Sequence, residues 1–105
     1  MLLKEGVSID GCRAEILIAA ISIIAPLYKR YGHQLVITSG TEKVKHSVKR
    51  SKHYCGDALD LRHYYFSDKA KHQIVEELKL KLGSNFVILL ERTHIHIHYA
   101  PVYEA

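Results

Sequence analysis

The chain has 105 residues, nearly half of them hydrophobic, which suits one compact domain with a single core and leaves no room for a second. Its formal charge of +4 favours a polyanionic partner, either nucleic acid, an acidic membrane or an anionic cell wall, without choosing among them. Cys12 and Cys55 are too few for a disulfide-stapled mini-domain, and we expect both to be packing residues.

The N-terminal sequence Met-Leu-Leu-Lys-Glu-Gly lacks the basic-then-apolar order of a secretory signal peptide. The apolar run over residues 16–27 is too short to span a bilayer. We therefore expect a protein that is cytoplasmic when synthesised and does not bind a membrane.

A first helix is predicted to begin after Asp10, its expected N-cap, and to end at Gly32. Pro26 is expected to kink this helix or to end it early, because proline lacks a backbone N–H. Apolar residues recur at helical spacing, namely Ala14, Leu17, Ile18, Ile21, Ile24 and Leu27.

Residues 35–38 are typical of a buried strand, and Ser39-Gly40 then opens a long polar segment. This segment carries cations and histidines at Lys43, Lys45, His46, Lys49, Arg50, Lys52 and His53. A basic loop of this length is either functional or a solvated surface, and the charge pattern leaves both open.

Residues 58–61 predict a short strand, after which Ser67 is expected to cap an amphipathic helix that ends at Gly83. Two further strands are predicted at 86–90 and 93–99. In the last strand Ile95 and Ile97 alternate with three histidines, so His94, His96 and His98 should share one face. The fold class expected is α+β, one domain over 1–105 with a small antiparallel sheet packed against two main helices.

Two clusters of residues contain the side chains expected to bind a metal and to catalyse a reaction. Residues 51–60 contain Ser51, His53, Gly56, Ala58 and Asp60, in which the glycine permits a turn between a loop histidine and a strand carboxylate. Residues 91–98 contain a glutamate and the three alternating histidines. Imidazole and carboxylate are good zinc ligands, and a catalytic zinc needs three protein ligands plus an open position for water.

These residues resemble the zinc D-Ala-D-Ala carboxypeptidases and L-alanyl-D-glutamate endopeptidases, whose pattern is Ser-x-His-x-x-Gly-x-Ala-x-Asp followed by Glu-x-x-His or His-x-His. Every fixed position of the first motif is matched here. The same metal site occurs in murein endopeptidases and in the signalling domain of hedgehog, and Thr38-Ser39-Gly40 also looks like phage and viral members. The resemblance covers about residues 35–99 and implies a fold of this type.

The resemblance implies that zinc is held by His53, Asp60 and one histidine of the second cluster. The Glu-x-x-His pattern selects His94 as that third ligand, whereas the His-x-His pattern selects His96. We favour His96, because the His-x-His pattern requires only two histidines that are neighbours on the same face of one strand. His94 then lies beside the catalytic water, Glu91 or His94 is the general base, and His46 assists. His98 is expected farther out, toward solvent.

One departure from the family pattern concerns substrate binding. Many members carry an arginine shortly after the Ser-Gly pair, whereas Thr41 and Glu42 stand here. Anchoring of the substrate is therefore expected from Ser51 and from a cation, which is Arg50, Lys52, Arg62 or another cation of the chain.

The function implied is zinc-dependent hydrolysis of peptidoglycan stem peptides by a monomeric D,D- or L,D-type carboxy- or endopeptidase, a phage lysis enzyme that acts on the wall after release or as part of a virion. The alternative is a zinc-stabilised, non-catalytic binding module of the same fold. Nucleic-acid binding is not expected, because no aromatic-interleaved basic strand or recognition helix accompanies the charge. The remaining histidines, His33, His63 and His72, are assigned no role.

Overall fold

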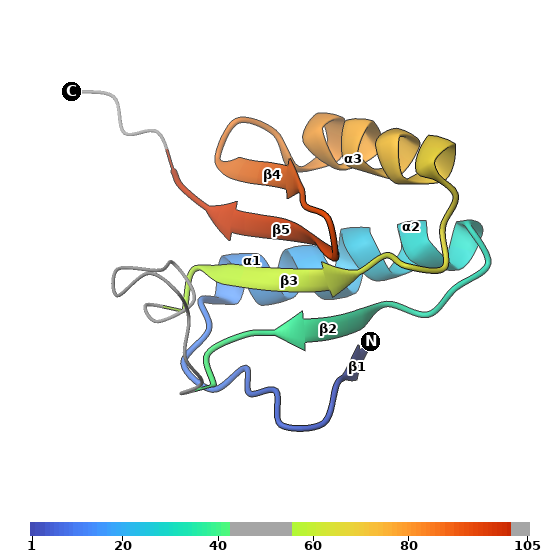
Figure 1. The fold of residues 1–105 in the computed structure, drawn as a ribbon. Helices are drawn as coiled ribbons and strands as arrows, with labels where there is room; N and C mark the ends of the chain where they lie inside the picture. The colour runs from blue at the N-terminus through green and yellow to red at the C-terminus, as the bar shows by residue number, and fades with distance from the viewer. Residues whose placement is uncertain (43–55, 102–105) are drawn as a thin grey trace.

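The computed structural model describes residues 1–42 and 56–101, which form a five-stranded sheet with helices on one face (Figure 1). The strands are β1 (Leu2–Leu3), β2 (Val36–Ser39), β3 (Ala58–Arg62), β4 (Phe86–Leu90) and β5 (His94–Tyr99), in the order β1-β2-β3-β5-β4. The α+β class is confirmed. The sheet is mixed rather than antiparallel throughout, because β1, which the sequence did not predict, pairs parallel with β2.

The N-terminal helix has three consecutive parts, α1 (Ala14–Ala19), the π-helical η1 (Ala20–Ile24) and α2 (Ala25–Arg30). Asp10 was wrongly predicted as its cap, since the chain first turns at Gly11 and the N-cap residue is Arg13. The helix also does not end early at Pro26. The π-helical turn directly before α2 changes the hydrogen-bond ladder where the proline N–H is missing, so the helix continues to Arg30.

The second helix, α3 (Asp68–Leu82), has the ends that the sequence predicted. The Ser67 hydroxyl accepts a hydrogen bond from the Ala70 N–H at 3.1 Å, and Gly83 follows the last turn with φ of 77°. Its buried residues Ile74, Val75 and Leu78 belong to the core. No helix within residues 1–42 and 56–101 is long and apolar enough to cross a membrane.

The core lies between the helices and one face of the sheet. Leu59 and Leu61 of β3 and Ile95 and Ile97 of β5 are fully buried in it. The helices contribute Ile16, Ala20, Ile24, Leu27, Tyr28, Ile74, Val75 and Leu78. Each fully buried leucine, isoleucine or valine side chain stabilises the fold by about 1.5–3 kcal/mol relative to exposure. Because strand side chains alternate, the even-numbered residues of β3 and β5 point to the opposite face, as predicted for the histidines.

Candidate metal centre

The pairing of β3 with β5 sets the position of the candidate site. In this antiparallel ladder Asp60 stands opposite His96, Arg62 opposite His94, and Ala58 opposite His98. All of these residues lie on the face away from the core. Directly opposed residues have Cβ atoms about 4.5–5.5 Å apart, so the register alone brings the carboxylate within reach of the histidines.

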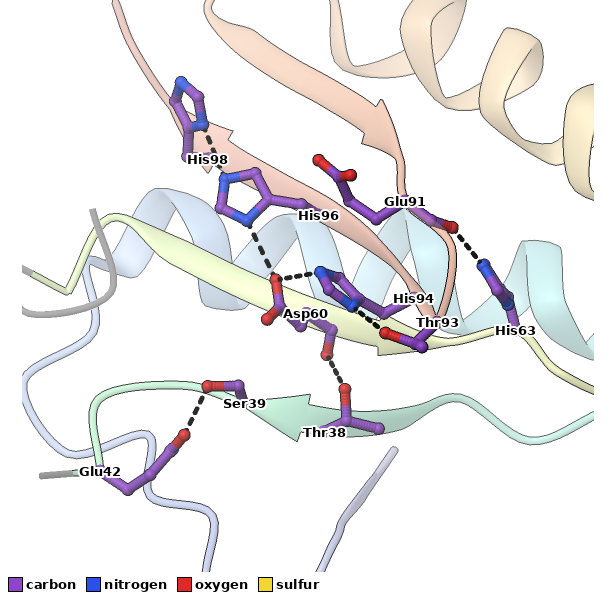
Figure 2. A network of polar contacts seen from close by, with 10 residues as sticks. All are labelled: Thr38, Ser39, Glu42, Asp60, His63, Glu91, Thr93, His94, His96 and His98. Atoms are coloured by element: carbon purple, nitrogen blue, oxygen red, sulfur yellow. Dashed lines mark hydrogen bonds and ion pairs between the residues drawn. The ribbon is translucent and has the colours of Figure 1, made fainter. Parts of the chain in front are cut away.

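Asp60 is the centre of the polar network that Figure 2 shows. Its Oδ1 atom lies 3.0 Å from Nδ1 of His96 and 3.6 Å from Nε2 of His94. The side chains of Asp60, His96 and His94 are 13%, 17% and 28% exposed, which leaves them partly desolvated but still reachable. The structure thus brings together three of the predicted site residues.

His98 does not lie apart from this network, contrary to the expectation from sequence. Its Nδ1 atom is 2.9 Å from Nε2 of His96, and the two rings meet at 61° with centroids 5.1 Å apart (Figure 2). Residues two apart on a strand share a face, and here the imidazoles incline toward each other. His96 therefore has both ring nitrogens within hydrogen-bond distance of a partner.

The donor set fits zinc in chemistry and in spacing. Two ligand atoms about 2.0–2.1 Å from a tetrahedral zinc are separated by about 3.3 Å, close to the 3.0 Å between Oδ1 of Asp60 and Nδ1 of His96, the two predicted ligands described by the structure. The described residues by themselves contain no group of three or more His, Cys, Asp or Glu side chains placed to hold a metal ion. The remaining predicted ligand, His53, lies outside the described residues, as do His46, Arg50, Ser51 and Lys52.

Gly56 fixes the chain where it enters β3. It has φ of +79°, and a Cβ atom at this position would stand only 2.2 Å from the Gly11 carbonyl oxygen. The Gly56 carbonyl accepts a hydrogen bond from the Arg13 N–H at 2.9 Å, and the Arg13 guanidinium pairs with Asp57. The motif glycine is thus required both for its backbone conformation and for close contact with the start of the N-terminal helix.

Glu42 has a structural role at the end of β2. Its carboxylate accepts hydrogen bonds from the backbone N–H groups of Ser8 and Gly40 and from the Ser39 hydroxyl. Burial opposes ionisation, but these hydrogen bonds outweigh it and lower the pKa of the Glu42 carboxyl. An acidic residue at this place therefore ties the N-terminal segment to the sheet, a role that the sequence analysis missed.

Glu91 lies in the turn between β4 and β5, not on the strand that carries the histidines. Its N–H donates to the His94 carbonyl at 2.9 Å, and its own carbonyl accepts from Nε2 of the buried His63 at 2.8 Å. The Glu91 carboxylate makes no hydrogen bond or ion pair within the described residues, and in Figure 2 it stands apart from the dashed network. His63, to which no role was assigned, holds this turn in place.

A hollow of about 400 Å³ adjoins the network. It is lined by Lys4, Thr38, Ser39, Asp60, Arg62, Tyr64, Thr93 and His94. Arg62 was predicted to contact substrate, and its guanidinium carbon lies 5.5 Å from the centroid of the Tyr64 ring. Lys4 was missed, because only the pairing of β1 with β2 brings the N-terminus to this place. The hollow therefore places two cations beside Asp60 and His94.

A sequence model of the family described as Peptidase M15 matches residues 1–98. Comparison with curated proteins gave no match, and comparison with solved structures gave none either. The family match spans β1 to His98 and so includes every described residue of the network. The chain belongs to the peptidase M15 family.

Proposed function

We propose that this protein is a zinc peptidase that hydrolyses peptide bonds in the stem peptides of peptidoglycan, with His53, Asp60 and His96 as its zinc ligands. M15 peptidases are generally zinc-dependent. The observation that carries the proposal is the convergence of His96 and His94 on one carboxylate oxygen of Asp60, at 3.0 and 3.6 Å.

When bound, zinc supplies an activated water and polarises the scissile carbonyl. The chain's own residues hold the metal, move the proton and orient the peptide. His94 lies beside Asp60 with its Nδ1 atom 2.9 Å from the Thr93 hydroxyl, and its Nε2 atom faces the network. His94 or the Glu91 carboxylate accepts the water proton, and with such a base no covalent intermediate is needed.

The cations of the hollow support a substrate that carries free carboxylates. Arg62 and Lys4 line it together with the hydroxyl groups of Thr38, Ser39 and Thr93. Stem peptides present carboxylates at their C-terminus and on side chains, and such groups form charge-assisted hydrogen bonds with lysine and arginine. The formal charge of +4 also favours approach to an anionic wall.

The test is digestion of purified stem peptides by the zinc-loaded protein, with the products identified by mass spectrometry. We expect a single peptide bond to be cut, and Asp60→Asn, which keeps the size of the side chain but removes its charge, to be inactive. Zinc binding without turnover on any stem peptide would contradict the peptidase proposal and favour the non-catalytic binding module.

A further inference from the structure

His98 is the histidine whose place in the structure differs most from expectation. It stands opposite the small Ala58 on β3, and its Nδ1 atom lies 2.9 Å from Nε2 of His96. On the other side of the His96 ring, Nδ1 lies 3.0 Å from Oδ1 of Asp60. The His96 imidazole is therefore held at both nitrogens, by a carboxylate on one side and an imidazole on the other.

This arrangement determines which nitrogen of His96 is available to a metal. A neutral imidazole carries one N–H, and the nitrogen that binds a metal must be unprotonated. If His96 binds zinc through Nδ1, the atom that faces the other proposed ligand Asp60, Nδ1 gives up the proton it would otherwise donate to the carboxylate. The proton of the His96 ring is then on Nε2. The atom placed to accept this Nε2–H is Nδ1 of His98, which requires His98 to carry its own proton on Nε2.

We infer that His98 is a positioning residue for the metal ligand His96. By accepting the Nε2–H, it fixes the tautomer and the orientation of the His96 ring, so that Nδ1 is unprotonated and faces the metal site. Groups that accept the second N–H of a ligating histidine commonly have this effect. The inference rests on the proposed zinc function, but it concerns metal affinity rather than catalysis.

Two substitutions separate positioning from other roles. His98→Ala removes the acceptor, and we expect it to weaken zinc binding by about 10–100-fold, the usual effect of losing such a partner. His98→Asn places an amide oxygen near the position of Nδ1, and we expect it to restore most of the affinity. His72→Ala, which removes an exposed histidine from α3, is the matched control and should bind zinc as the wild type does.

The measurement is the zinc dissociation constant from competition with a chelator, with thermal unfolding of the zinc-free proteins as the control for folding. A second readout is ¹⁵N NMR of the zinc-loaded wild type, in which both His96 and His98 should be protonated at Nε2. This measurement uses only the wild-type protein, so its result does not depend on whether a variant folds.

Three results would overturn the inference. Unchanged zinc affinity in His98→Ala would show that the contact does not act on the metal site. If His98→Asn loses zinc as completely as His98→Ala does, His98 would be a ligand and not a positioning residue. If Nδ1 of His98 carries a proton, His98 cannot accept the Nε2–H of His96. Zinc binding without peptide hydrolysis would contradict only the proposed function, whereas wild-type protein that binds no zinc would contradict both.

Discussion

At the scale of single residues, the proposed metal ligands and the proposed general base stand in different places. Asp60 and His96 face each other across two strands, whereas the Glu91 carboxylate lies on the turn and is exposed. An ionised carboxylate that is not engaged in a hydrogen bond is available as a base. The structure gives the Glu91 carboxylate no hydrogen-bonding role within the described residues, and its role as general base stays a prediction.

We predict that Glu91→Gln leaves zinc bound and lowers turnover by about two to four orders of magnitude, the usual contribution of a positioned general base. The neighbouring exposed Arg92→Gln is the control and should have little effect. Steady-state kinetics on a stem peptide, with zinc content measured in parallel, checks this. Near-normal turnover in Glu91→Gln would assign the base role to His94.

A second prediction at this scale concerns the choice between His94 and His96 as ligand. His96 is directly opposite Asp60 and its Nδ1 atom is the closer of the two, so His96→Ala should lose zinc. His94→Ala should keep zinc and lose most activity. Zinc retained in His96→Ala but lost in His94→Ala would reverse the assignment.

At the scale of elements, the sequence determined which face of a strand each residue occupies but not how the strands are placed. The alternation of Ile95 and Ile97 with the histidines predicted the polar face, and Ser67 and Gly83 predicted the ends of α3. The register that sets Asp60 against His96 depends on long-range pairing. The contact between His96 and His98 depends on ring orientation, which spacing along a strand does not determine.

The turn at Gly56 gives a prediction about how the elements are joined. Gly56 and Gly83 have nearly equal φ values, +79° and +77°. A Cβ atom added at Gly83 would meet no atom within 4 Å, whereas one added at Gly56 would collide with the Gly11 carbonyl. Gly83→Ala should therefore cost only the strain of positive φ, about 1–3 kcal/mol. Gly56→Ala should cost more, and urea denaturation of the zinc-free proteins measures the difference. Equal costs would mean that the contact with Gly11 is not tight.

Tyr28 links α2 to the end of β3. Its hydroxyl donates to the Arg62 carbonyl at 2.8 Å, and the ring is fully buried. Tyr28→Phe should cost about 0.5–1.5 kcal/mol, the net value of one hydrogen bond. The lost bond also leaves the β3 carbonyl without this donor beside the candidate site.

Burial also raises the pKa of Tyr28. The folded-state pKa of Tyr28 lies above the unfolded-state value of about 10, so its contribution to stability is complete at pH values below about 10. That contribution is lost as the pH rises above about 10, because the tyrosine then ionises in the unfolded chain before it ionises in the folded one. Urea denaturation at neutral pH and above about pH 10 should show a smaller alkaline loss of stability in Tyr28→Phe than in the wild type. The same alkaline loss in both proteins would contradict this reading.

At the scale of the whole molecule, the features that sequence analysis missed share a physical cause. β1 is only two residues long, which is too short to show the alternation of apolar and polar residues that marks a strand in a sequence. The pairing of β1 with β2 brings Lys4 to the hollow. Glu42 can tie the N-terminal segment to the sheet only because Ser8 folds back beside Gly40. These features arise from contacts between segments far apart in the chain.

We propose above all that Asp60 and His96 form part of a zinc site. The direct measurement is the zinc content of the purified protein after equilibration with the metal and removal of the excess. We predict about one zinc per chain in the wild type and almost none in Asp60→Ala, which should also lose the rise in melting temperature that zinc gives the wild type. The same zinc content and the same thermal stabilisation in Asp60→Ala as in the wild type would contradict the account.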